Sequence, residues 1–151
     1  MRTIPVVRYA IWTARFAFSA TLLSAIADRL GFWGPHGAHN VAWGDWSHFV
    51  HYTGVLNRYA PAVLIPIISW IATILEALFA VAFLLGFKLE WTAYGSAILF
   101  ALFALGMTWG TGVKTALDAS VFVDAAGALL LGALLTAIRK NIRLAPASPQ
   151  A

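Results

Sequence analysis

Long apolar segments alternate with short polar ones along the chain, and this pattern predicts four membrane-spanning helices. The apolar segments cover residues 6–30, 60–87, 91–110 and 119–138. The hydrocarbon core of a bilayer is ~30 Å thick and is crossed by about 20 mostly apolar residues, so each segment is long enough. The expected fold class is all-α, an integral membrane four-helix bundle that forms one domain over residues 1–144. Residues 145–151 are expected to form a disordered C-terminal tail.

The connection between the first two spans, residues 31–59, is expected to contain a short extra helix. Asp45 can cap its first turn, and apolar or small side chains follow with amphipathic spacing at Trp46, Phe49, Val50, Thr53 and Leu56. Such a helix is expected to be interfacial, flat on the outer membrane face with its aromatic side chains down. It would also roof the bundle.

Composition and charge support a membrane protein and exclude several other classes. The chain is 61% hydrophobic and 11% charged, whereas soluble domains are typically ~25% charged. Basic residues gather before the first span and after the last, at Arg2, Arg8, Arg139, Lys140 and Arg143. This bias orients the chain with both termini in the cytoplasm and does not indicate a nucleic-acid partner. The absence of cysteine excludes thiol exchange, cysteine-ligated iron–sulfur clusters and c-type haem.

Two ionisable residues, Arg15 and Glu76, interrupt otherwise apolar spans, and such residues are functional candidates. Glu76 belongs to a stripe of polar and small residues with Ser69, Thr73 and Ala80, which predicts that it faces the bundle interior. A carboxyl buried there must be protonated or paired, and Arg15 on the neighbouring antiparallel helix is the expected partner. A structural ion pair and a ligand-binding or proton-handling site are both open interpretations. Arg15 also argues against reading the first span as a cleaved signal peptide.

Further candidates lie towards the outer ends of the spans. Asp124 in the fourth span needs a cationic partner, for which Arg29 or Lys114 is within reach. The spacing of His48 and His51 is that of a weak metal-ligand pair, and His36 and His39 repeat it. A working site needs three or four ligands with supporting groups, so no metal site is predicted.

Four ordered sequence elements resemble the DoxX family of small bacterial membrane proteins. They read LLSAIADRLGFWGP, NVAWGDWSHFVHYTGVLN, WIATILEALFAVAFLLGF and KTALDASVFVDAAGALLL. The resemblance implies a four-helix bundle in the bacterial cytoplasmic (inner) membrane and a relation to a subunit of a thiosulfate:quinone oxidoreductase. The positions that match the family motifs are Asp28, Arg29, Trp33, Glu76, Asp118 and Ser120.

Two functions follow as expectations. The first is a quinone-linked or redox-stress-related oxidoreductase subunit, in which Glu76 and Arg15 bind the quinone or accept its protons while a partner protein handles electrons. The second is a non-catalytic membrane scaffold or assembly chaperone. No cofactor motif is evident, although a quinone is a candidate ligand, and whether the chain is an enzyme is open. The expected partners are the lipid bilayer and a soluble or membrane redox protein, with a homo-oligomer also open. Transport is disfavoured, because four helices without an inverted repeat leave little room for alternating access.

Overall fold

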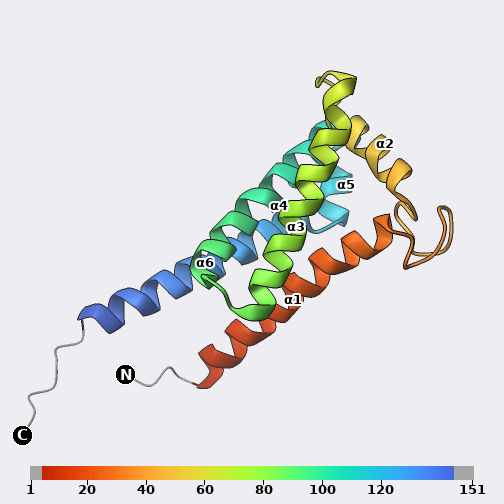
Figure 1. Cartoon of the computed structure of the whole chain (residues 1–151). Coiled ribbons are helices and arrows are strands. Elements are labelled where there is room, and N and C mark those ends of the chain that lie inside the picture. The colour runs from red at the N-terminus through yellow and green to blue at the C-terminus, as the bar shows by residue number, and fades with distance from the viewer. Residues whose placement is uncertain (1–4, 145–151) are drawn as a thin grey trace, which may run out of the picture.

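The structure, a computed structural model, describes residues 5–144, and this part of the chain contains helices and no strands. Residues 1–4 and the expected tail at 145–151 lie outside the described part. Four of the helices, one of them extended at its start by the 3₁₀ turn η1, are long and apolar enough to cross a membrane, which confirms the all-α prediction (Figure 1). In chain order the elements are α1 (Pro5–Arg29), α2 (Trp46–Leu56), η1 (Ala62–Leu64), α3 (Ile65–Leu85), α4 (Leu89–Thr111), α5 (Val113–Asp118) and α6 (Val121–Leu144).

The helix boundaries differ from the predicted ones for local reasons. The segment predicted to begin at residue 60 starts as η1, and α3 itself begins at Ile65 with Pro66 in its first turn, where proline removes no helical hydrogen bond. Gly86 ends α3 in the left-handed conformation at φ 69°, which glycine adopts without strain. The predicted fourth span, residues 119–138, corresponds to α6, which begins at Val121 because Ser120, with φ 58°, separates it from the short α5.

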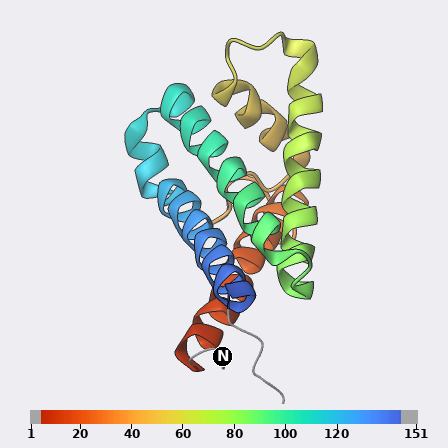
Figure 2. The same ribbon diagram turned by 90° about the vertical axis from the view of Figure 1, so that its left-hand side faces the viewer.

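The long helices pack mainly as two antiparallel pairs, α1 with α3 and α4 with α6. The start of α1, the turn between α3 and α4, and the end of α6 lie at one end of the molecule, which we call the inner end (Figure 1). The helices α2 and α5 lie towards the opposite, outer end. The view in Figure 2 shows α2 beside the first half of α3, away from α6.

The inner half of the bundle is closed by a core of aromatic rings and small side chains. The ring of Phe18 lies 5.3 Å from that of Phe83 and 5.9 Å from that of Phe100. Alanines that are fully buried or nearly so, Ala80, Ala93, Ala97 and Ala128, let the helices approach closely around these rings. The two helix pairs therefore meet tightly in the inner half.

The short helix α2 confirms the element predicted in the long loop. Asp45 caps it by accepting a hydrogen bond from the backbone N–H of His48. Its last turn packs against α4, where Gly106 and Gly110 leave room for Leu56. These glycines therefore serve a contact within the chain, and α2 is held over the outer half of the bundle.

The cap of α2 predicts a response to acid. Hydrogen bonds from the His48 backbone, the Ser47 hydroxyl and the His48 ring hold the pKa of Asp45 below its usual value of 3.8. A carboxyl whose pKa is lower in the folded state stabilises that state fully above the unfolded value, and loses this contribution as the pH falls towards the folded value. We expect the protection factors of the α2 amides, which correct for the intrinsic pH dependence of exchange, to fall as the pH falls below 3.8.

The matched variant for this experiment is Asp45→Asn, because asparagine is also a good N-cap but does not titrate. The acid-induced fall in protection should be smaller in that variant than in the unsubstituted protein. An equal acid response in the two proteins would show that another group controls the docking of α2.

Candidate functional site

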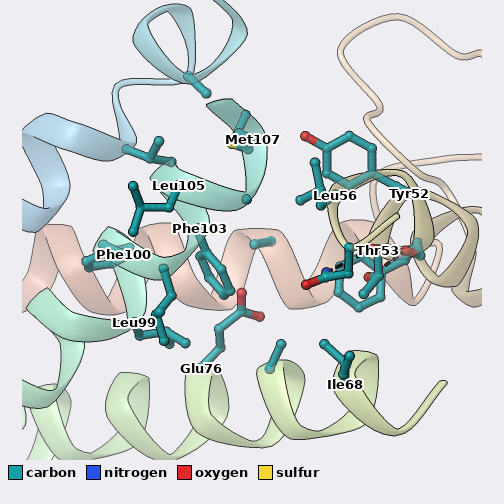
Figure 3. Close-up of a pocket in the computed structure, with 18 of the residues that line it drawn as sticks. Tyr52, Thr53, Leu56, Ile68, Glu76, Leu99, Phe100, Phe103, Leu105 and Met107 are labelled. Atoms are coloured by element: carbon teal, nitrogen blue, oxygen red, sulfur yellow. Dashed lines mark hydrogen bonds between the residues drawn. The ribbon is translucent and has the colours of Figure 1, made fainter. Parts of the chain in front are cut away.

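A partly open cavity of about 880 Å³ occupies the outer half of the bundle. It lies between α1, α3, α4 and the start of α6, and α2 forms its roof. The walls are mainly apolar, and its volume falls within the ~300–1,000 Å³ typical of small-molecule sites. The aromatic residues of the walls include Trp43, Phe49, Tyr52, Phe100 and Phe103. Figure 3 shows several of these side chains around Glu76.

Glu76 and Arg29 form a buried ion pair in the wall of this cavity. The Arg29 Nη1 lies 2.7 Å from Oε2 of Glu76, and Nη2 donates to Oε1 at 3.3 Å. The two side chains are only 1% and 4% exposed. The stripe prediction is confirmed, since Glu76 is buried together with Ser69, Thr73 and Ala80.

The Arg29 guanidinium is contacted by hydrogen-bond acceptors at its edges and by an aromatic ring over its face. Nη1 donates to the Thr73 hydroxyl at 2.6 Å, and Nε donates to the Ala25 carbonyl at 3.2 Å. The Phe49 ring centre lies 3.7 Å from the guanidinium carbon, and the Trp43 ring centre lies 5.1 Å from it. Cation–π contacts of this kind are strongest where water is excluded. Arg29 thus ties α1 to α3, to the loop before α2 and to α2 itself.

The second carboxylate oxygen of Glu76 lacks a well-aligned hydrogen-bond donor. Oε2 is in ion-pair contact with Arg29, but no group in residues 5–144 donates a well-aligned hydrogen bond to it. Figure 3 shows the carboxylate directed from α3 into the cavity. Because Oε2 is buried against Arg29, the cavity wall presents the charged carboxylate of Glu76 as a whole and not a free oxygen atom.

The predicted pairing of Glu76 with Arg15 is wrong. Arg15 instead donates from Nε to the Phe83 carbonyl and from Nη2 to the Leu84 carbonyl, both at 2.8 Å. These carbonyls lie in the last turn of α3 at the inner end of the bundle, where carbonyls lack the usual partner four residues on. The Phe83 carbonyl also accepts from the Gly86 N–H at 3.2 Å. Trp12 covers the guanidinium, with its ring centre 4.0 Å from the Arg15 carbon. Arg15 therefore caps a helix and lies outside the cavity.

The register of α1 against α3 explains why Glu76 pairs with Arg29 and not with Arg15. The Ser19 hydroxyl donates to the Ala80 carbonyl at 3.0 Å. Because the two helices are antiparallel, Leu23 of α1 lies at about the same depth in the bundle as Glu76, about 12 Å along α1 from Arg15. Side chains on a helix lean towards its N-terminus. Arg15 therefore leans away from Glu76, whereas Arg29 leans back along α1 towards it and Glu76 leans towards Arg29.

Asp124 also lines the cavity, from the first turns of α6. Both predicted partners are wrong, because Arg29 pairs with Glu76 and Lys114 pairs with Asp118. Within the described residues no ion pair reaches Asp124. The cavity therefore carries carboxylates on two walls, one paired with Arg29 and one without a cation.

Asp28 organises the loop that covers Arg29. Its carboxylate accepts hydrogen bonds from the backbone N–H groups of Ala42, Trp43 and Gly44 at 2.8–2.9 Å. These bonds place the Trp43 ring beside Arg29. Asp28 itself is not part of the cavity wall, so it is a structural residue of the site.

The other positions that match the family motifs lie outside the cavity wall. Trp33 donates from its indole nitrogen to the Ser24 carbonyl at 3.1 Å, and 61% of the residue is exposed. Asp118 pairs with Lys114 on α5. Ser120 forms the turn between α5 and α6.

The four histidines do not converge on one point. The rings of His36 and His48 stack with centres 3.6 Å apart. The Nδ1 of His36 donates to the Trp43 carbonyl, and that of His48 contacts Asp45, while His51 is exposed. Within residues 5–144 no three His, Cys, Asp or Glu side chains are arranged to hold a metal ion.

Comparisons with protein-family models, with curated proteins and with solved structures found no match to this chain. The resemblance to the DoxX family therefore stays a prediction. The function has to be argued from the cavity and the residues that line it.

Some residues of the site were not identified from the sequence. Phe49 and Thr53 were expected on the membrane-facing side of α2, but they are buried against the bundle. Tyr52 lines the cavity too, and burial raises the pKa of its hydroxyl. The amphipathic pattern located an apolar face of α2, but it could not distinguish lipid from protein as the partner of that face.

Proposed function

We propose that this chain is a multi-pass protein of the bacterial cytoplasmic membrane, with both termini in the cytoplasm, that binds a membrane-soluble quinone or its quinol in the cavity. It would act as a redox subunit beside a partner that carries electrons. The observation that carries the proposal is the Glu76 carboxylate, a charged acceptor paired with Arg29 in the wall of an apolar cavity among membrane-length helices.

The cavity suits both the flat ring and the polar oxygen atoms of such a ligand. Aromatic walls from Phe49, Phe100 and Phe103 favour a flat apolar ring. When a quinol is oxidised it releases two electrons and two protons, and a carboxylate within hydrogen-bonding reach accepts a proton from the hydroxyl oxygen. Glu76 is placed to accept one of the two protons, Asp124 on the α6 side of the cavity is the acceptor for the other, and the two electrons pass to the partner protein.

A scaffold is the second candidate function, and one observation favours it. The Arg29 network joins α1, α2 and α3 without any ligand, through Glu76, Thr73 and the Phe49 ring. A structural ion pair of this kind would fix the helix register and leave the outer loop to bind a client protein.

The proposal is tested by titrating the purified protein in detergent with a decyl-benzoquinone and with its hydroquinone, monitored by tryptophan fluorescence. Saturable binding of at least one form is expected. Glu76→Gln should weaken that binding by about tenfold or more, because the charged acceptor is removed. If neither form binds to the unsubstituted protein, the scaffold becomes the better explanation.

Glu90→Gln is the matched control for this experiment. Glu90 accepts from the Thr136 hydroxyl at 2.7 Å and pairs with Arg139 at 3.0 Å, towards the inner end and away from the cavity. The control makes the same chemical change and also breaks an ion pair with an arginine. Its ligand affinity should match that of the unsubstituted protein.

A further inference from the structure

We infer that the cavity selects a ligand whose polar group donates a hydrogen bond, so that the hydroxyl-bearing quinol binds more tightly than the quinone. This inference rests on the proposed function and adds to it which of the two forms the site is built to hold. It depends on the balance of donors and acceptors around the polar end of the cavity.

Glu76 presents an acceptor to the ligand. Arginine stays protonated in proteins, and its charge beside Glu76 favours the ionised carboxylate. A carboxylate has lone pairs and no proton, so a ligand group that hydrogen-bonds to Glu76 has to supply the hydrogen. A hydroxyl does this, whereas a quinone carbonyl would bring a second set of lone pairs against it.

Arg29 is poorly placed to serve a quinone carbonyl instead. Its three nitrogens already contact the Ala25 carbonyl, the Thr73 hydroxyl and both oxygens of Glu76. Phe49 lies over its face. Arg29, the one cation that residues 5–144 contribute to the cavity wall, is thus engaged by the protein itself.

The other polar groups of the cavity wall include both acceptors and donors. Asp124 adds a second carboxylate, on the α6 side of the cavity. The Thr53 hydroxyl donates to the Phe49 carbonyl at 2.9 Å. The Tyr52 hydroxyl can donate or accept, so it favours neither form of the ligand. N–H or O–H donors also line the cavity, on Trp43, Asn57, Tyr59 and Trp109. The preference therefore depends on the two carboxylates, which accept hydrogen bonds and do not donate them when ionised.

The inference is tested with three probes of nearly equal shape, added to the full chain in detergent. These are a decyl-benzoquinone, its hydroquinone and the dimethyl ether of that hydroquinone, which cannot donate. A hydrogen bond to a charged acceptor corresponds to about tenfold in affinity or more. The hydroquinone is therefore expected to bind at least about tenfold more tightly than either of the other two probes.

Each outcome decides between the inference and the proposed function. Equal affinity for the hydroquinone and the quinone, or for the hydroquinone and its ether, would overturn the inference and leave the quinone site standing. Binding of none of the three would overturn the proposed function itself. These comparisons use the unsubstituted protein, so they do not depend on whether a variant folds.

A variant adds a second, independent readout. In Glu76→Gln the side-chain amide can donate to a carbonyl, so the preference for the hydroquinone over the quinone should fall to near unity. Glu90→Gln should retain the full preference. An unchanged preference in Glu76→Gln would show that Glu76 is not the discriminating group and would overturn the inference.

Discussion

Replacing Arg29 with alanine is expected to lower the free energy of unfolding by about 3–5 kcal/mol, the range for breaking a buried ion pair from one side. The substitution would leave Glu76, which is 3% exposed, without its cation. It would also remove the contacts of the guanidinium with Phe49 and Trp43. Thermal or denaturant unfolding in detergent, followed by circular dichroism, measures the loss.

Arg15→Ala is the comparison for this experiment. Arg15 donates to two carbonyls near the inner surface and is only half-buried, so its loss should lower the free energy of unfolding by about 1–2 kcal/mol. The combination of Arg29→Met with Glu76→Leu should recover much of the stability lost in Arg29→Ala, because no charge is left buried. Equal effects of Arg29→Ala and Arg15→Ala would contradict the pairing of Glu76 with Arg29.

Gly110→Ala is expected to displace α2 from α4. A Cβ atom at position 110 would lie 2.7 Å from the Leu56 Cα and 2.8 Å from the Val55 carbonyl oxygen, and backbone atoms cannot move aside as a flexible side chain does. Overpacking of this kind typically lowers stability by about 1–3 kcal/mol. The roof of the cavity should open as a result.

The chain contains no cysteine, so a single Thr53→Cys substitution on α2 reports the opening directly. Thr53 is buried and lines the cavity. Its labelling by a water-soluble maleimide should be faster in the Gly110→Ala background. Gly106→Ala is the matched control, because a Cβ there would meet nothing closer than 3.7 Å. Equal labelling rates of Thr53→Cys in the Gly110→Ala and Gly106→Ala backgrounds would show that the contact at Gly110 does not hold the roof in place.

The parts of the fold that depend on local pattern were predictable. The apolar runs located the four helices of membrane length, with boundaries that shifted by a few residues. Asp45 followed by an amphipathic run located α2, and the stripe through Glu76 identified the buried face of α3. Each of these features repeats along one helix or one turn, so neighbouring residues in the sequence carry the information.

The pairing of charges was not predicted correctly, and its cause lies in geometry between helices. Arg15 was favoured because it interrupts an apolar run, whereas Arg29 stands at the end of its helix and looks like an ordinary boundary residue. The N-terminal lean of helical side chains, applied to antiparallel α1 and α3, would have favoured Arg29 over Arg15. Applying this rule required the register of α1 against α3, which the contact of Ser19 with the Ala80 carbonyl establishes.

Hydrophobic periodicity and the placement of caps were enough to establish an all-helical chain, four membrane-length helices and a short helix between the first two. The cavity, the roof formed by α2 and the ion pair of Arg29 with Glu76 emerged when the helices were packed together. The reason is that burial along one helix follows from residue spacing, while a cavity and a long-range ion pair depend on helix register and on how closely small residues such as Gly110 let two helices approach.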